Sequence, residues 1–244
     1  MLDLPKIKAI SFDLDDTLWP IWPTIERAEK ALHDWLGFHA PMAAAMFANA
    51  GALREIRNEI GATRPDLKSD LSALRRESIR LALARAGENP SLAEPAFDVF
   101  FEERQRVTLF DDALAALDFL SARLPLVSIS NGNADVEKVG LARYFRASIS
   151  AREFGVGKPD PRIFLAAAGA LELPPEEVLH VGDDATLDGL GALNAGMQCA
   201  WLNRADHLWP HEMAPHVTVT DLDELCALWR EPGTGSGLPQ ARGR

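Results

Sequence analysis

The stretch "ISFDLDDTLWP" at residues 10–20 places three aspartates directly after an apolar run. The run begins near residue 7 and is typical of a short, fully buried strand in a parallel sheet. Asp13, Asp15 and Asp16 follow it within four positions, and crowded carboxylates repel one another unless a cation compensates them. The stretch therefore predicts a sheet whose first strand ends at a cation site.

Short apolar segments further along the chain predict the rest of this sheet. With residues 7–13 they make five strands, the others lying at 126–130, 147–150, 178–183 and 198–202. Helical patterns at 112–123, 134–142, 160–171 and 185–195 separate the later strands. This alternation predicts an α/β fold, with a Rossmann-like parallel sheet covered by helices on both faces.

The segment after the first strand breaks the alternation, because it shows only helical patterns. These run from Thr24 to a stop at Gly37, and over 41–59, 69–86 and 92–107. We predict an inserted helical cap at 19–108 and a catalytic core made of 1–18 and 109–230. Residues 231–244 are rich in Gly and Pro, which predicts a disordered tail.

Composition narrows the functional classes. The chain has 244 residues, with 36 acidic and 25 basic side chains and a formal charge of -11, which disfavours general binding to nucleic acid or anionic membrane. Neither a membrane-spanning stretch nor a secretory signal pattern is recognisable. We expect a cytoplasmic monomer or homodimer with a small-molecule partner, in which Cys199 and Cys226 are buried thiols.

Chemically suggestive side chains follow the other strands too: Ser130 and Asn131 after the second, Lys158 in the loop beyond the third, and Asp183 and Asp184 after the fourth. The carboxyl ends of parallel strands share one edge, so these residues should meet near Asp13. An all-oxygen environment suits a hard ion such as Mg²⁺. With an ammonium and hydroxyl donors beside it, such a site suits a phosphoryl group.

Four segments carry a family resemblance. "DLDDTLW" at 13–19, "ISNGN" at 129–133, "GKPDPRIF" at 157–164 and "HVGDDATLDGLGALNAGM" at 180–197 resemble the four ordered motifs of the haloacid dehalogenase-like hydrolase superfamily. The match spans residues 6–202 in the expected order. It implies the capped phosphatase branch, with a cap of the C1 type and Mg²⁺ as cofactor.

The resemblance also implies roles for single residues. Asp13 would attack phosphorus and form an aspartyl-phosphate, and Asp15 would protonate the leaving group and then deprotonate water. Lys158 would neutralise charge on Asp13 and on the phosphoryl group. Thr17 would brace the loop, and with Ser130 and Asn131 it would contribute to phosphate binding.

The implied metal site draws on the same loops. Mg²⁺ would be held by the Asp13 carboxylate, the Asp15 backbone carbonyl and Asp183. Asp184 and Asp188 would support these ligands from outside the metal's direct contacts.

Rival functions share parts of this site. A 2-haloacid dehalogenase, as the family is known, lacks the second aspartate and the metal, because a halide needs no protonation; Asp15 therefore favours a phosphatase. A phosphomutase would share the first displacement, and a signalling receiver domain or a non-catalytic phospho-binding regulatory relative would share the acidic cluster. The receiver is disfavoured by the cap and by the position of Asp13 after the first strand.

The substrate is harder to predict. "VLHVGDD" at 178–184 and "GMQCAWLNR" at 196–204 resemble bacterial phosphatases of flavin mononucleotide and 5-amino-6-(5-phosphoribitylamino)uracil. A phosphorylated sugar alcohol or nucleotide-like metabolite is implied. Trp19 and Trp22 could stack on a flat ring, although packing of the cap against the core is the simpler interpretation. The cap arginines Arg54, Arg57, Arg75, Arg76 and Arg80 are most simply explained as solvated faces, with the alternative that one of them reaches a second charge on the substrate.

Overall fold

The computed structural model describes residues 1–46 and 50–230. The tail that the sequence predicts to be disordered, residues 231–244, lies outside this range.

The core is one sheet of six parallel strands in the order β3-β2-β1-β4-β5-β6. The strands are β1 (Ala9–Phe12), β2 (Leu126–Ser130), β3 (Phe145–Ser150), β4 (Val178–Gly182), β5 (Gln198–Leu202) and β6 (Val217–Val219). All five predicted strands are present, and the sixth was missed. β6 has three residues and only Val219 is fully buried, so it lacks the apolar run that identified the others.

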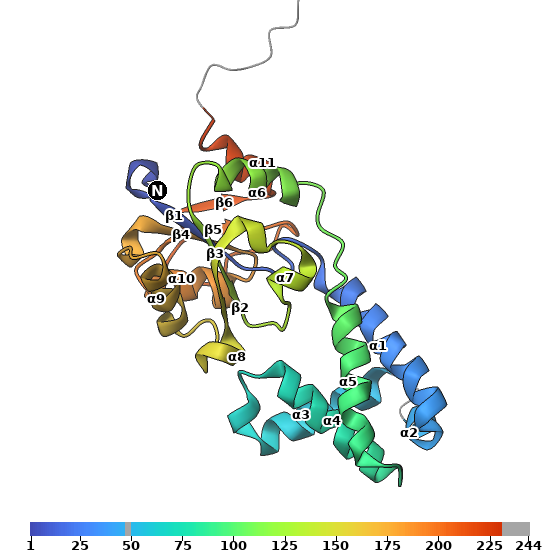
Figure 1. The fold of residues 1–244 in the computed structure, drawn as a ribbon. Helices are drawn as coiled ribbons and strands as arrows, with labels where there is room; N and C mark the ends of the chain where they lie inside the picture. Colours follow the sequence, from blue (N-terminus) through green and yellow to red (C-terminus); the bar gives the residue numbers. More distant parts are fainter. Residues whose placement is uncertain (47–49, 231–244) are drawn as a thin grey trace, which may run out of the picture.

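Helices cover both faces of the sheet (Figure 1), which confirms the predicted fold class. On one face α6 (Ala113–Ser121) and α11 (Leu222–Ala227) pack on Phe12 and Leu179. On the other, α9 (Pro161–Ala170) and α10 (Gly191–Asn194) pack on Val127 and Val178. All four residues of β1 are buried, because this strand lies in the middle of the sheet between both layers.

Shorter elements connect the strands. They are α7 (Val136–Val139), α8 (Ala151–Phe154), a π-helix at Ala185–Leu190, and 3-10 turns at Leu4–Lys6, Pro65–Leu67, Pro90–Leu92, Ala142–Tyr144 and Pro175–Glu177. The π-helix matters most, because it presents Asp188 to the end of β4.

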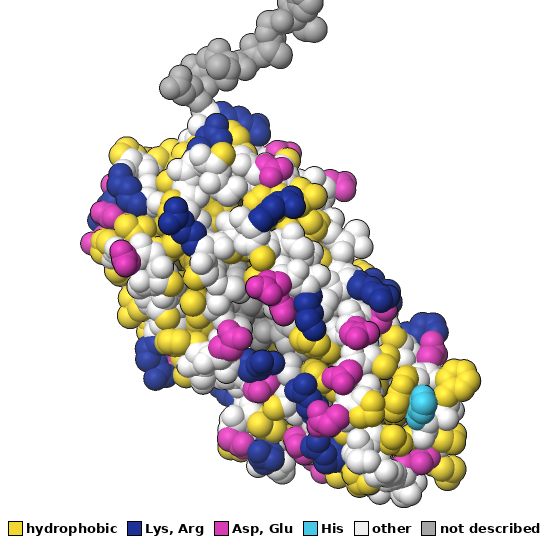
Figure 2. Space-filling model, viewed as in Figure 1, with side chains coloured by type: hydrophobic (Ala, Val, Ile, Leu, Met, Phe, Trp, Pro, Cys, Tyr) yellow, Lys and Arg dark blue, Asp and Glu magenta, His cyan; other side chains and the backbone are white. Residues whose placement is uncertain are grey.

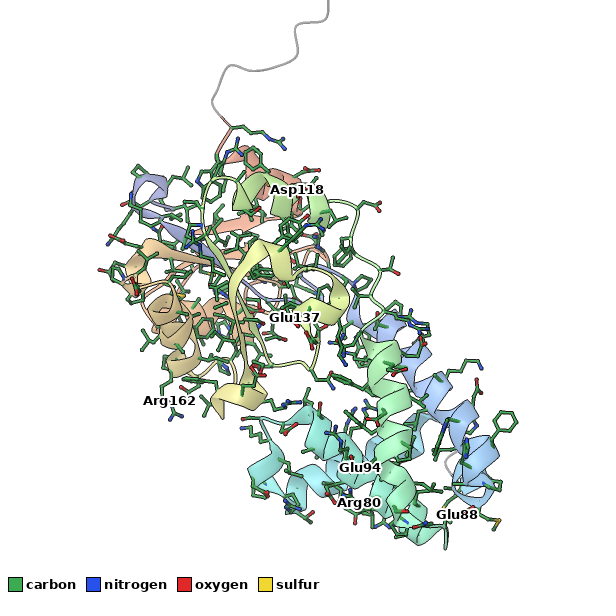
Figure 3. All side chains as sticks on the ribbon, viewed as in Figure 1. Arg80, Glu88, Glu94, Asp118, Glu137 and Arg162 are labelled. Atoms are coloured by element: carbon green, nitrogen blue, oxygen red, sulfur yellow. The ribbon has the colours of Figure 1, made fainter. Side chains whose placement is uncertain are left out.

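Five helices lie between β1 and α6 and extend away from the sheet (Figure 1). They are α1 (Ile21–His39), α2 (Pro41–Met46), α3 (Ala50–Thr63), α4 (Leu71–Arg85) and α5 (Ala93–Arg104). Leu32, Leu83 and Phe97 belong to a hydrophobic cluster separate from the two at the sheet. Arg80 of α4 and Glu94 of α5 lie side by side (Figure 3), with Nη2 and Oε1 2.7 Å apart.

Two predicted helix limits in this region are wrong. The first helix begins at Ile21 rather than Thr24, and it continues past the expected stop at Gly37. Nothing crowds Gly37, and the rings of Trp35 and His39 stack 4.1 Å apart across it, which supports a further turn. Within the range predicted as one helix, 41–59, the structure describes α2 up to Met46 and α3 from Ala50; residues 47–49 between them lie outside the described residues.

The surface agrees with the composition. Figure 2 shows acidic and basic side chains interspersed on one face, with no continuous basic area among the described residues visible there. In the described ranges, no helix has both the length and the apolar character needed to cross a membrane. Cys199 and Cys226 are buried free thiols, as predicted.

Candidate active site

The predicted site residues meet at the carboxyl edge of the sheet. Asp13 follows β1, Ser130 ends β2 and Asp183 follows β4, while Lys158 enters from the loop between α8 and α9. Asp13 and Lys158 are each 6% exposed. Charged groups this deeply buried need partners, and they find them in one another.

Lys158 is the centre of a buried polar chain. Its Nζ atom donates to Oδ1 of Asp13, and also to Oδ1 of Asp188 at 2.6 Å. The same Asp188 oxygen lies 3.1 Å from Nε2 of His180, whose Nδ1 lies 2.8 Å from Oγ of Ser11. This chain runs from Ser11 in β1 through His180 in β4 and Asp188 in the π-helix, and it fixes the lysine against Asp13.

The groups of this chain shift one another's pKa values. Burial alone would lower the pKa of Lys158, but the charges of Asp13 and Asp188 outweigh burial and raise it. Burial likewise opposes ionisation of Asp188, yet Lys158 and His180 bring the pKa of Asp188 down to about 2. The lysine is therefore a cation and Asp188 an anion at neutral pH.

Three carboxylates form a potential cation site. Oxygens of Asp13, Asp183 and Asp188 lie within 4.8 Å of one another. Burial raises the pKa of Asp13 well above its ordinary value, and Lys158 offsets this only in part. Burial and the charges of Asp188 and Asp16 raise the pKa of Asp183 to about 7. These oxygen donors fit a hard divalent cation, which would relieve their repulsion.

Asp188 and Asp184 occupy different positions in this site, although the sequence analysis predicted the same supporting role for both. Asp188 is buried inside the carboxylate cluster rather than outside it. Asp184 is exposed, and its side chain accepts hydrogen bonds from the backbone N–H groups of Thr186 and Leu187 at the start of the π-helix. The π-helix places Asp188 near β4, a geometry that no sequence spacing reveals.

The loop after β1 is held by its own side chains. Oγ1 of Thr17 lies 3.2 Å from Oδ1 of Asp183 and 3.4 Å from Oδ2 of Asp13, so this hydroxyl bridges the two carboxylates. Asp16 has a φ of 59° and accepts a hydrogen bond from the backbone N–H of Ile21 at 2.8 Å. Asp16 thus stabilises the turn that leads into α1, and it is not part of the carboxylate cluster.

Asp15 is separated from that cluster and held by different partners. Nε1 of Trp19 donates to its Oδ1 at 2.8 Å. Nη2 of Arg104 donates to its Oδ1 and Oδ2 at 2.7 and 2.8 Å. A Cβ on Gly132 would lie 2.3 Å from Oδ2, so only glycine lets the second loop pass this close.

Ser130 and Asn131 shape the second loop. Oγ of Ser130 accepts a hydrogen bond from the backbone N–H of Gly132 at 2.9 Å. Both polar ends of the Asn131 side chain bond to the backbone of Lys158, at 2.7 and 2.8 Å. Asn131 therefore holds the lysine loop, and its contact with a substrate stays a prediction.

The sequence analysis missed two contacts of Asp15, and it misjudged the burial of one arginine. Trp19 is fully buried in the core cluster, and its indole N–H binds Asp15 four positions earlier, a spacing visible in the opening stretch. Arg104 is far from every motif and gave no local signal. Arg75 is largely buried rather than solvated, whereas Arg76 and Arg80 form surface ion pairs with Glu94.

Comparisons with known proteins agree with this geometry. A family model of haloacid dehalogenase-like hydrolases matches residues 7–196. The 5-amino-6-(5-phospho-D-ribitylamino)uracil phosphatase YigB of Escherichia coli (strain K12) is 34% identical over 233 residues, covering 92% of this chain and 97% of that protein. A phosphoserine phosphatase of Thermus thermophilus is 36% identical over 157 residues, 62% of this chain and 63% of its own.

A solved structure shares the whole architecture. A 2-haloacid dehalogenase from Pseudomonas syringae pv. tomato DC3000 superposes with a TM-score of 0.85 at 38% identity, over 92% of this chain and 100% of that one. A parallel sheet with an aspartate and a lysine at its carboxyl edge, and helices inserted after the first strand, is the arrangement of a hydrolase with a Rossmann-like core. The chain belongs to the haloacid dehalogenase-like hydrolase family. Within that family it is a phosphoric monoester hydrolase.

Proposed function

We propose that the enzyme hydrolyses a small phosphorylated metabolite in a Mg²⁺-dependent reaction, through an aspartyl-phosphate on Asp13. The observation that carries this proposal is the pairing of two different aspartates on one loop. Asp13 bonds to buried Lys158, while the Asp15 side chain accepts N–H bonds from Trp19 and Arg104 and is not part of the carboxylate cluster. One carboxylate is thus arranged as a nucleophile and the other for proton transfer.

The two displacements use these residues in turn. An Asp13 oxygen attacks phosphorus as the bond to the leaving oxygen breaks, and Asp15 gives that oxygen its proton. Water then attacks phosphorus, giving its proton to Asp15 as the bond between phosphorus and Asp13 breaks. Lys158 compensates negative charge throughout, and Ser130 and Thr17 line the same edge of the sheet.

We assign the cation to Asp13, Asp183 and the backbone carbonyl of Asp15, with Asp188 close enough to join or orient the ligands. Bound there, Mg²⁺ would supply positive charge to the phosphoryl oxygens. Asp188 is already engaged by Lys158 and His180, so its main part is to hold Lys158 in place.

We further propose that residues 19–108 act as the cap, 1–18 and 109–230 as the core. A cavity of about 330 Å³ lies where the two meet. Its walls come from α1, α3, α4, α5 and the second core loop: Ile21, Trp22, Ile25, Glu29, Arg57, Leu71, Arg75, Phe100 and Asn133. Asn133 is connected to Asp15 through Arg104. Nε of Arg104 donates to Oδ1 of Asn133 at 3.2 Å, and Nη2 of Arg104 donates to Asp15. The cavity is thus next to the proposed position of the leaving group.

The walls suit a flat polar group. Arg75 lies 3.8 Å above the ring of Phe100 and pairs with Glu29 at 3.3 Å. Burial, together with the charges of Arg57 and Arg104, lowers the pKa of Arg75 to about 10 despite that ion pair. Aromatic faces with both a carboxylate and guanidinium groups can read a heterocycle that carries donors and acceptors. We infer flavin mononucleotide or a related ribityl phosphate, in keeping with the E. coli relative.

A substrate screen tests this proposal. Purified enzyme is assayed with para-nitrophenyl phosphate, flavin mononucleotide and a panel of sugar and amino-acid phosphates, with Mg²⁺ and with a chelator. We expect turnover that requires the metal and favours ribityl phosphates. Peptide mass mapping of acid-quenched enzyme should find the phosphate on Asp13. Metal-independent turnover, or labelling of another residue, would contradict the mechanism.

Dehalogenation is the second candidate, because the dehalogenase from P. syringae superposes so closely. A halide leaves without a proton, so Asp15 and its donors would have no purpose in that reaction. Halide release from 2-chloropropionate should therefore be absent under conditions that support phosphate release. The cytoplasmic location and the monomeric or dimeric state stay predictions from the sequence.

A further inference from the structure

Arg104 is a buried cation at the junction of cap and core. It is the last residue of α5, and it is 1% exposed. Its Nη2 atom binds Asp15 and its Nε atom binds Asn133, but Nη1 has no partner among the residues that the structure describes. A buried N–H without a partner costs about 1–3 kcal/mol. Packing alone therefore explains this arginine poorly.

What Arg104 does accomplish is to fix the Asp15 carboxylate. The carboxylate accepts N–H bonds at both oxygens from Arg104 and at Oδ1 from Trp19. On the remaining side the backbone of Gly132 leaves no room for even a methyl group. The Asp15 side chain, which is 21% exposed, is thus in contact with Arg104, Trp19 and Gly132 on three sides.

We propose that Arg104 is a positioning residue for proton transfer by Asp15, so that this step depends on where the cap lies. The inference rests on the proposed function, which gives Asp15 the proton. In the first displacement the O–H bond of Asp15 breaks, the leaving oxygen takes the proton, and phosphorus releases that oxygen with the bonding pair. The carboxylate that results keeps the bonds from Arg104 and Trp19, and it receives a proton from water in the second displacement.

The position of Arg104 depends on the cap helices, although the next residue, Gln105, also bonds to the core loop at the backbone of Asn133 and Asp135. α5 packs along α1 and α4. The arginine's second partner, Asn133, donates through Nδ2 to Oγ of Ser72 on α4 at 3.2 Å. A tilt of these helices away from the core would draw Arg104 from Asp15, while Lys158 and Asp13 would keep their contact. The nucleophile is therefore independent of the cap, and the proton donor is coupled to it.

The test compares two leaving groups. Hydrolysis of ribitol 5-phosphate releases an alkoxide that needs a proton, whereas para-nitrophenyl phosphate releases a stable phenolate. Because kcat/KM reports only steps up to the first displacement, Arg104→Gln should lower it about 100-fold for ribitol 5-phosphate and less than about tenfold for para-nitrophenyl phosphate. Arg104→Lys should recover part of the loss, since an ammonium can still donate to one carboxylate oxygen.

Two further variants make the outcomes decisive. Arg106→Gln changes an exposed arginine two positions away and should leave both kcat/KM values unchanged. Asp15→Asn should show the same split as Arg104→Gln, only larger. If the Arg104 variants lose kcat/KM equally on both esters, while Asp15→Asn still loses more on ribitol 5-phosphate than on para-nitrophenyl phosphate, this inference alone is overturned. Absence of the split in Asp15→Asn would overturn the proposed role of Asp15 itself. If Arg104→Gln does not fold, a smaller split in Arg104→Lys is required.

Discussion

The two walls of the site are built in opposite ways. The core wall consists of buried polar side chains at the carboxyl edge of the sheet, and Asp13 and Lys158 are each 6% exposed and bonded together. The cap wall consists of long side chains on helices, and Trp22 is 60% exposed. Groups that make and break bonds need fixed positions, whereas groups that select a substrate need room. The difference separates the nucleophile, which the core wall holds, from substrate selection, which the cap wall provides, while Arg104 connects the cap to the proton donor.

The largest effect is expected from Asp13→Asn on the core wall. An amide is a far poorer nucleophile than a carboxylate, so kcat should fall by at least about 1,000-fold on every phosphate ester. The change keeps the size of the side chain, and burial of Asp13 already penalises its charge, so the thermal midpoint should not fall. Phosphate release and calorimetric unfolding measure the two quantities.

Asp34→Asn is the matched control for that substitution, because Asp34 is an exposed residue of α1 that pairs with Lys30 on the same helix. Its kinetics should equal those of the unmodified enzyme. Residual activity of the Asp13 variant above a few per cent, after deamidation is excluded by mass, would remove Asp13 from the nucleophile role.

Gly182→Ala should have the next largest effect, again on the core wall. The new Cβ would lie 2.3 Å from Cγ of Asp188, so this carboxylate must move away from Lys158 and His180. A displacement on that scale should lower kcat about 100-fold for all substrates alike. Gly169→Ala, at a helical position with open space around it, should leave kcat unchanged. A substrate-dependent loss in Gly182→Ala would show that the two walls are not separate.

The acidic cluster predicts a pH-dependent affinity for Mg²⁺. Burial and the charges of Asp188 and Asp16 raise the pKa of Asp183 to about 7, so below this pH a cation must displace a proton from the carboxyl group. Affinity should therefore fall as pH falls, by up to about tenfold for each unit below 7. Calorimetric titration with Mg²⁺ in two buffers of different ionisation enthalpy measures both affinity and proton release. Equal affinity at pH 5.5 and pH 8 would contradict the assignment of Asp183.

The same division explains how much the sequence could predict. The core wall follows from the apolar runs that end at Asp13 and Asp183, because strand order and parallel direction bring those ends together. Five strands and the approach of Asp183 to Asp13 were predicted on this basis, whereas Asp188 was expected outside the direct contacts of the metal. β6 was not, since its position depends on packing against β5 rather than on a pattern of its own.

The cap wall was predicted only as helices. Arg104 reaches Asp15 across 89 positions of sequence, and its burial results from how α5 packs on α1 and α4. Arg75 was expected in solvent because a charged residue on an amphipathic helix usually faces water, yet Glu29 and the ring of Phe100 compensate it inside. Such contacts depend on tertiary structure, so no local motif reveals them.

The smallest effect, and the sharpest test of the comparison, is expected from Trp22→Ala. Trp22 lines the cavity between cap and core and is not one of the residues that form the carboxylate cluster, so its loss should raise KM and leave kcat nearly unchanged. Stacking on a flat ring is worth about 1 kcal/mol, which corresponds to about a fivefold rise in KM for flavin mononucleotide. For ribitol 5-phosphate, which has no ring, KM should hardly change. Phe38→Ala removes an exposed aromatic residue from the same helix outside the cavity and should change neither value. A fall in kcat with unchanged KM would show that Trp22 acts in the chemical step rather than in substrate selection. The proposed difference between the core wall and the cap wall would then be wrong for this residue.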